Sequence, residues 1–395
     1  MNYLLSKQNL NMSDNKRHNK IMNFVSEYPL LRTNRHCVSN YNTIYATSDI
    51  HSDFRKFIQA LIKFNLIIIP KNIDIFTDDI YNTLLITDTK WNNKKKKVLV
   101  VIVGDLIDGK RPDGNSLNDE VGSFEFLLHA FIYNMRIKAL LCDSHIVFTI
   151  GNHDHHNIII NDIVLQNYTR PSAINYFGDV LKRREILIPF YECNPFYDLV
   201  LLNKDDTKNT IFVHGGLHSN KAKMVNFDIV QNFILENIGC FIDIEQQLKK
   251  MLINAFSNSR SAIWTRYYAD NTDSCSIIEK DLTNTLVVIG HCPTDNNCKH
   301  ISKIMENDIR YDMCNKEHGC VVTGCNRKSD NGPNLVFVDS ALSSIFHSND
   351  NDERRVIEFL KLTHIPSKKD KNRYYNKIER IESPTKICHL MFKNV

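Results

Sequence analysis

The sequence lacks any hydrophobic run that could cross a membrane, because a spanning helix needs roughly 18 or more consecutive apolar residues. Its strongly apolar segments, such as Val98–Val103, have only the length of a strand. Residues 1–20 also lack the continuous apolar stretch of a signal peptide. We therefore expect a soluble, cytoplasmic protein that has no contact with membranes.

The sequence also lacks an excess of one charge and any CxxC pair among its cysteines. Its 49 lysines and arginines against 45 aspartates and glutamates give a net charge of +4. This is no signature of nucleic-acid binding, which requires a clustered basic face. With 395 residues, of which 43% are hydrophobic and 24% charged, the chain can bury a full core without disulfides. The composition thus predicts a globular protein whose 11 cysteines are mostly reduced thiols.

Five of the cysteines gather in one stretch that also contains His300 and His318. They are Cys292, Cys298, Cys314, Cys320 and Cys325. A structural zinc site normally uses closely spaced ligand pairs, and this stretch has none. We expect ordinary free thiols here, with a structural zinc site as the alternative.

Apolar, β-branched segments of strand length alternate with helical patterns from about residue 42 onward. We predict strands at Thr43–Ser48, Val98–Val103, Ile146–Ile150, Thr210–Val213, Thr285–Ile289 and Leu335–Val338. We predict helices at Phe54–Phe64, Glu125–Leu141 and Phe227–Phe256, the last interrupted near Gly239. Alternating strands and helices indicate an α/β or α+β sandwich.

The remaining segments set the expected domain organisation. Residues 1–35 are a polar N-terminal extension with a partial helix at Lys20–Leu31, and residues 36–349 form the main domain with insertions. One insertion is a predicted hairpin in which a strand at Thr83–Thr87 joins Val98–Val103 through the polar turn WNNKKKK. Residues 350–395 form a C-terminal tail whose strand at Arg355–Leu360 completes the domain.

Five short motifs rich in histidine and carboxylate residues occur in order, and each directly follows a predicted strand. They are Asp49-Ile50-His51, Gly104-Asp105-Leu106-Ile107-Asp108, Gly151-Asn152-His153-Asp154, His214-Gly215-Gly216 and Gly290-His291. Side chains at the carboxyl ends of strands face a common crevice, where binding sites form in open α/β sheets. Imidazole nitrogens suit zinc and iron, whereas carboxylate and amide oxygens suit harder ions such as manganese. The pattern therefore predicts a site for a pair of divalent metal ions.

Such a site suits the hydrolysis of phosphate esters, which requires an activated water and positive charge near the phosphoryl group. Asp105 is the natural bridge between two ions, because a carboxylate has lone pairs for both. A histidine held by a carboxylate has a fixed orientation and can donate a proton near neutral pH. We therefore expect His153, paired with Asp108, to protonate the leaving oxygen.

The five motifs resemble those of the calcineurin-like metallophosphoesterase superfamily, which carries DxH, GDxxD, GNH(D/E), a lone His and GH in this order. The resemblance runs from about residue 42 to about residue 345. Three further segments are similar to the phosphoprotein phosphatase branch, which includes serine/threonine phosphatases: His214–Leu217, Trp264–Arg266 and Val338–Ser343. The resemblance implies a four-layer αββα sandwich, in which two packed mixed β-sheets are flanked by helices.

The resemblance also assigns a role to each matching residue. It places the metal ligands at Asp49, His51, Asp105, Asn152, His214 and His291, with the first two on one ion, Asp105 bridging, and the last three on the second ion. The two divalent ions are expected to be Mn, Fe or Zn. His153, oriented by Asp108, would be the proton donor, and Arg266 and Asn152 would bind the phosphate.

Two positions depart from the pattern of the family. Many relatives have an arginine directly after GDxxD, where this chain has Gly109. Lys110 and Arg111 follow closely as candidate substitutes, and Arg111 is included among the expected phosphate ligands. Other relatives end in GHxH and bind metal through the second histidine, where this chain has Pro293. That difference favours the phosphoprotein phosphatase pattern, in which the first ion has fewer protein ligands and more water.

We expect the protein to hydrolyse phosphate monoesters, with phosphoserine and phosphothreonine proteins as substrates. The alternative is a hydrolase of nucleotides or dinucleoside polyphosphates. Bacterial-type relatives of this branch act on such substrates, and the missing arginine favours this alternative. A third hypothesis is a scaffold that binds partners without turnover, and the complete set of predicted metal ligands disfavours it. The sequence does not determine the oligomeric state.

Overall fold

The computed structural model describes residues 41–95, 97–109, 120–155, 157, 177–193, 196–197, 199–204, 208–216, 265–270, 285–292, 323–325, 335–339, 359–366, 374–381 and 387–389. The predicted helices at Lys20–Leu31 and Phe227–Phe256, the boundaries at residues 35 and 349, and most of the cysteine stretch lie outside these residues. Lys110, Arg111 and Pro293 lie outside them as well. Within this described part, no helix is long and apolar enough to cross a membrane.

Seven strands form the larger of two main sheets. Their order is β14 (Ile387–His389), β13 (Tyr374–Ile381), β12 (Phe359–Pro366), β1 (Thr43–Thr47), β4 (Val98–Val103), β5 (His145–Thr149) and β6 (Phe196–Tyr197). The strands from β1 to β6 run parallel, whereas β12, β13 and β14 are antiparallel. Strand β12 overlaps the predicted strand Arg355–Leu360 and pairs with β1 at the centre of the sheet, while residues 355–358 lie outside the described residues.

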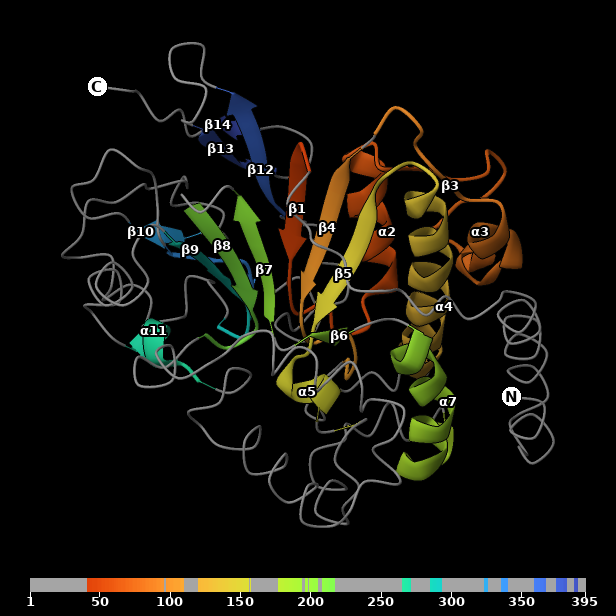
Figure 1. Ribbon diagram of the computed structural model, residues 1–395. Coiled ribbons are helices and arrows are strands. Elements are labelled where there is room, and N and C mark those ends of the chain that lie inside the picture. The colour runs from red at the N-terminus through yellow and green to blue at the C-terminus, as the bar shows by residue number, and fades with distance from the viewer. Residues whose placement is uncertain are drawn as a thin grey trace.

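Five strands form the second sheet, which is also mixed. Their order is β10 (Thr323–Cys325), β11 (Leu335–Phe337), β9 (Thr285–Ile289), β8 (Lys208–Val213) and β7 (Leu199–Lys204). The central strands β11, β9 and β8 run parallel, and the edge strands pair antiparallel. In Figure 1 this sheet lies beside the larger one, and its strands β8 and β7 contact β4 and β5 of the larger sheet.

Alternate residues of β1 and β4 point to opposite faces of the large sheet and so build two separate cores. The face toward the second sheet carries Ile44, Ala46, Leu99, Val101 and Val103, which pack with Phe212, Leu286, Val288 and Val336. The opposite face carries Tyr45, Val98, Val100 and Ile102, which pack under α2 (Phe54–Lys63) and α4 (Glu120–Leu140). A strand buried on both faces has a continuous apolar sequence, which explains why the run VLVVIV correctly predicted a buried strand at Val98–Val103.

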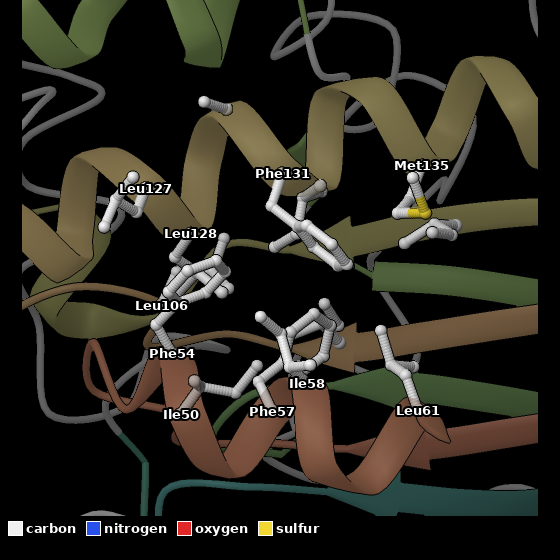
Figure 2. Packing of buried hydrophobic residues seen from close by; sticks show 14 of the residues in the cluster. Ile50, Phe54, Phe57, Ile58, Leu61, Leu106, Leu127, Leu128, Phe131 and Met135 are labelled. Carbon is white, nitrogen blue, oxygen red and sulfur yellow. The ribbon is translucent and has the colours of Figure 1, made fainter. Parts of the chain in front are cut away.

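Helices α2 and α4 cover the outer face of the large sheet. Figure 2 shows Phe54 and Ile58 of α2 directed toward Phe131 of α4, and the Phe54 and Phe131 rings lie 5.6 Å apart. Helix α7 (Val180–Cys193) lies beside α4 (Figure 1). The described layers are therefore helix, sheet and sheet, which confirms the predicted α/β sandwich of two mixed sheets. Helix α4 begins at Glu120, earlier than the predicted Glu125.

The predicted hairpin is wrong, because Thr83–Thr87 forms helix α3 and not a strand. The Asn82 side chain accepts a hydrogen bond from the Leu84 backbone N–H at 3.0 Å, which caps the start of this helix. At its other end, Lys138 of α4 donates to the carbonyl oxygens of Thr87 and Thr89 at 2.6 and 2.5 Å. Capping and packing against α4 thus override the β propensity of these residues.

The segment between α2 and β4 is consequently a mixed insertion. It contains β2 (Ile67–Ile68), the 3-10 helix η1 (Asp78–Tyr81), α3 and β3 (Lys90–Trp91). Strand β3 pairs with β2 and not with β4. The long interval between the first two motifs is therefore filled by a small subdomain packed on α4.

Candidate metal centre

All five motifs follow strands, and the strand ends bring them to one edge of the two sheets. The motifs follow β1, β4, β5, β8 and β9, and the third forms the short helix α5 (Asn152–Asp154). Figure 1 shows the arrowheads of β1, β4 and β5 directed toward α5. The predicted position of every motif after a strand is thus confirmed.

Backbone hydrogen bonds join the loops that follow β1, β4, β8 and β9. The N–H groups of Asp49 and His51 donate to the carbonyls of Gly104 and Asp105 at 3.1 and 3.0 Å. Gly290 N–H donates to the carbonyl of His214 at 2.9 Å. Because each loop is tied to a neighbour, side chains from distant parts of the chain are held at fixed separations.

Two glycines allow this close approach of the loops. Gly104 has φ +80°, in the left-handed region that favours glycine. A Cβ atom at Gly290 would collide with the Ser48 hydroxyl and lie 2.8 Å from a carboxylate oxygen of Asp49. No larger residue fits at Gly290 without moving the loop that carries the first motif.

The backbone of the site is strained at residues that carry its chemistry. Left-handed φ values of +45° to +73° occur at Asp49, His51, Asp105, Asp108 and His291. Each such non-glycine conformation costs roughly 1–3 kcal/mol and persists only where its surroundings enforce it. Strain of this kind clusters at functional sites, and here it coincides with residues of three of the five motifs.

Two groups of potential metal ligands share one carboxylate. His51, Asp105 and His153 offer ligand atoms within 4.8 Å of one another, and so do Asp105, His214 and His291. Asp105 belongs to both groups and is only 1% exposed. A single buried carboxylate between two clusters is the arrangement that a pair of bridged cations requires.

Two histidines are oriented by backbone carbonyls. Nδ1 of His51 lies 3.1 Å from the Ile107 carbonyl oxygen, and Nδ1 of His214 lies 2.7 Å from that of Val103. Since a carbonyl oxygen only accepts, each Nδ1 carries the proton and each Nε2 presents its lone pair. Hydrogen bonds of this type set the tautomer of histidines that bind metals.

The lone pairs in the second group converge on one another. Nε2 of His214 lies 2.9 Å from Asn152 Oδ1 and 3.3 Å from Asp105 Oδ2. Without a metal ion, a second proton on His214 is what keeps these three groups from facing one another as acceptors, and a bound cation would replace that proton. Burial lowers the pKa of His214, but the carboxylates of Asp105 and Asp49 raise it to about 10 overall. The residues present therefore fit a bound cation.

Asp49 and His291 are placed against the same cluster. Asp49 Oδ2 accepts a hydrogen bond from the His291 backbone N–H at 3.0 Å, and Asp49 Oδ1 lies 3.8 Å from His51 Nε2. Burial and the nearby Asp339 carboxylate raise the pKa of Asp49. Burial and the positive charges of His214 and Arg266 lower the pKa of His291, which keeps its imidazole neutral and able to bind a metal ion.

His153 differs from the other clustered residues because its side chain is 25% exposed. Its Nδ1 lies 2.6 Å from Asp108 Oδ2, and its backbone N–H donates to Asp105 Oδ1 at 2.9 Å. The ring meets His51 edge to face, with centroids 4.9 Å apart. Because Nδ1 is paired with the buried carboxylate of Asp108, Nε2 remains for chemistry on the open side of the site.

The structure brings Arg266 into electrostatic reach of the cluster, since its charge contributes to the lowered pKa of His291. Arg266 itself is exposed. Tyr268, two residues on, packs against Gly216, so that the loop after β8 and the segment carrying Arg266 are neighbours. Gly109 is buried where relatives carry an arginine.

Asp154 and Glu125 hold the backbone of the loops that carry the potential metal ligands, and the sequence analysis did not assign them this role. Asp154 accepts hydrogen bonds from the backbone N–H groups of Asp105 and Gly151 at 2.8 and 3.0 Å and from the Tyr191 hydroxyl at 2.9 Å. Glu125 accepts from the Asp108 N–H at 2.8 Å. The available signal was a carboxylate within the apolar run FEFLLHAF, which must find a buried partner.

The α/β sandwich and the clustered potential ligands fit a metal-dependent hydrolase, and sequence comparison agrees. The profile of the family described as calcineurin-like phosphoesterase matches residues 43–323. A search of curated protein sequences finds no significant match. The chain belongs to the calcineurin-like phosphoesterase family. It is therefore a hydrolase of phosphoric esters from a family that uses divalent metal ions.

The solved structures that resemble this chain include several named as phosphatases. A cold-active protein tyrosine phosphatase matches with a TM-score of 0.50 and 14% identity over 86% of this chain and 76% of that chain. A mutant of a cold-active protein tyrosine phosphatase matches with a TM-score of 0.51 and 14% identity, covering 89% and 83%. A protein serine/threonine phosphatase from Saccharomyces cerevisiae has a TM-score of 0.39 and 11% identity, covering 98% and 90%. At these identities the first two establish a shared fold.

Proposed function

We propose that the protein is a two-metal phosphatase that hydrolyses phosphate monoesters, with phosphoserine and phosphothreonine proteins as its substrates. The observation that carries the proposal is the single buried carboxylate of Asp105 between two groups of ligand atoms. When bound, two divalent ions provide a water of lowered pKa and neutralise charge on the phosphoryl group. Manganese, iron and zinc suit this mixture of nitrogen and oxygen donors.

Side chains of the protein would hold the two ions, donate the proton and bind the phosphate. Asp49 and His51 would hold one ion and Asn152, His214 and His291 the other, with Asp105 between them. These side chains are at most 8% exposed, which suits ligands enclosed by protein. Among the described residues of the cluster, His153 has the most exposed side chain, so a substrate would approach from its side.

His153 would donate the proton that the leaving oxygen needs. Its partial exposure and its 2.6 Å contact with Asp108 support this role over that of a metal ligand. General acid catalysis of this kind contributes roughly 100- to 10,000-fold to the rate. Arg266 would bind the phosphate, because a guanidinium presents a planar fork that matches two phosphate oxygens.

The proposal is tested with purified protein, manganese and p-nitrophenyl phosphate. We expect hydrolysis that stops on chelation and returns with manganese. Asp105→Asn should abolish it and His153→Asn should reduce it, whereas the exposed control Lys182→Gln should not. Full activity in both site variants would refute the assignment of the site.

A substrate panel separates the protein phosphatase from the alternative, a hydrolase of nucleotides or dinucleoside polyphosphates. Gly109 favours the alternative, because it removes an arginine that many relatives use. The panel compares phosphoserine, phosphothreonine and phosphotyrosine peptides with nucleotides and diadenosine polyphosphates. Phosphotyrosine is included because the structures of similar fold are named protein tyrosine phosphatases. Higher kcat/KM for the serine and threonine peptides supports the proposal, and higher values for nucleotides overturn it.

A further inference from the structure

A fully buried ion pair lies behind the Asp108–His153 pair. Arg183 of α7 donates from Nε to Glu125 Oε2 at 2.9 Å and from Nη2 to Glu125 Oε1 at 2.7 Å. Arg183 is 1% exposed and Glu125 is fully buried. Two parallel hydrogen bonds between a guanidinium and a carboxylate fix both groups in one plane, with a rigidity that lysine cannot reproduce.

The Arg183–Glu125 pair contacts Asp108. Glu125 Oε1 also accepts the backbone N–H of Asp108 at 2.8 Å, and Arg183 Nη2 lies 3.6 Å from Asp108 Oδ1. The Asp108 backbone has φ +73°, a strained value that its surroundings must enforce. Glu125 therefore supports the residue whose carboxylate orients the imidazole of His153.

Arg183 is also connected to His153, through the side chain of Asn157. Arg183 Nη1 donates to Asn157 Oδ1 at 2.6 Å, and Asn157 Nδ2 donates to the backbone carbonyl of His153 at 2.8 Å. Asn157 is only 2% exposed. One guanidinium thus connects, through a single intervening side chain on each side, to both members of the Asp108–His153 pair.

We propose that Arg183 is a positioning residue, which through Glu125 and Asn157 sets the distance and orientation between Asp108 and His153. The inference rests on the proposed role of His153 as proton donor. The three nitrogens of Arg183 are directed to Glu125 and Asn157 and to none of the proposed metal ligands. Its loss should therefore impair protonation of the leaving group while metal content stays unchanged.

The kinetic test uses two substrates that differ in their need for a proton donor. Phenyl phosphate has a poor leaving group, whereas p-nitrophenyl phosphate has a good one. Since a general acid contributes roughly 100-fold or more, we expect Arg183→Lys to lower kcat about 10- to 100-fold on phenyl phosphate and only a few-fold on p-nitrophenyl phosphate. KM and bound metal, measured by mass spectrometry, should match the wild-type protein.

A double variant shows whether Arg183 acts through Asp108. Asp108→Asn alone should reduce kcat on phenyl phosphate at least as much as Arg183→Lys does. Adding Arg183→Lys to Asp108→Asn should reduce it no further, because residues that act in one chain are not additive. The matched control is Lys182→Gln, which removes a half-exposed cation from the adjacent position of the same helix.

A spectroscopic readout is independent of turnover. In protein with 15N-labelled histidine, we expect the Nδ1 proton of His153 to give a downfield resonance that disappears in His153→Asn, because Nδ1 lies 2.6 Å from Asp108 Oδ2. We expect this resonance to persist in Lys182→Gln and to shift or vanish in Arg183→Lys. If Arg183→Lys does not fold, Glu125→Gln combined with Arg183→Met replaces it, since both buried charges are then removed together.

Equal losses on both substrates, additive losses in the double variant, or an unchanged His153 resonance would each overturn the inference. Different results would refute the proposed function itself. They are a wild-type protein that hydrolyses neither aryl phosphate with manganese, or an Asp105→Asn variant that retains activity. An active wild type with an inactive Asp105→Asn and an insensitive Arg183→Lys would leave the proposed function standing and remove only the positioning role.

Discussion

His129 makes the stability of the protein depend on pH through a buried, neutral imidazole. It is fully buried on α4, where its ring stacks on Phe190 of α7 at 5.7 Å and meets the ring of Tyr191. Neither ring nitrogen has a hydrogen-bond partner in the part of the chain that the structure describes. Burial, with the charge of Arg183, lowers the pKa of His129 from 6.5 to about 3.

The sign of the effect follows from proton binding. Between pH 6.5 and about pH 3 the unfolded chain binds a proton at His129 and the folded chain does not, so that stability falls as the pH falls. Lowering the pH from 7 to 5 should cost about 2 kcal/mol, and the whole window corresponds to about 5 kcal/mol. His129→Phe keeps an aromatic ring in place and removes this contribution.

The assay is urea unfolding of the wild-type protein and His129→Phe at pH 7 and pH 5. The free energy of unfolding of the variant, relative to wild type, should improve by about 2 kcal/mol on going to pH 5. The control Phe131→Leu creates a defect in the same helix without a titratable group, and its difference from wild type should not change with pH. A difference between His129→Phe and wild type that is identical at both pH values would refute the reasoning.

Three further variants test the packing of the site and of the insertion. Gly290→Ala should abolish metal binding, because the added Cβ collides with Ser48; wild-type metal content by mass spectrometry would contradict this. Tyr191→Phe removes the hydrogen bond to Asp154 and should lower metal affinity roughly 10- to 100-fold, measured by competition with a chelating dye. Asn82→Ala removes the cap of α3 and should lower the free energy of unfolding by about 1 kcal/mol, with activity unchanged.

The strands around the site could be predicted because they are buried on both faces. Such strands read as continuous apolar runs bounded by polar turns, and Val98–Val103 and Thr285–Ile289 were located by that signal to the residue. The motifs that follow them were located with equal accuracy, since they are defined by residue type and order along the chain.

Thr83–Thr87 could not be predicted in the same way. Its sequence is apolar and β-branched, which favours a strand in isolation. The cap at Asn82 and the contacts from Lys138 decide in favour of a helix. Lys138 is distant in sequence, and no local pattern shows that its amine reaches the end of this segment.

The sequence by itself determined the fold class, the order of the motifs and the residue types of the candidate metal centre, because these depend on local hydrophobicity and on the donors that each motif offers. Only the tertiary structure decided which donors share Asp105 and which residues stand behind Asp108 and His153. A carboxylate in an apolar helix, such as Glu125, needs a cationic partner when it is buried. The sequence contains 49 lysines and arginines and does not show which of them is that partner. The packing of α7 against α4 selected Arg183, because contacts between distant segments are set by the geometry of the core.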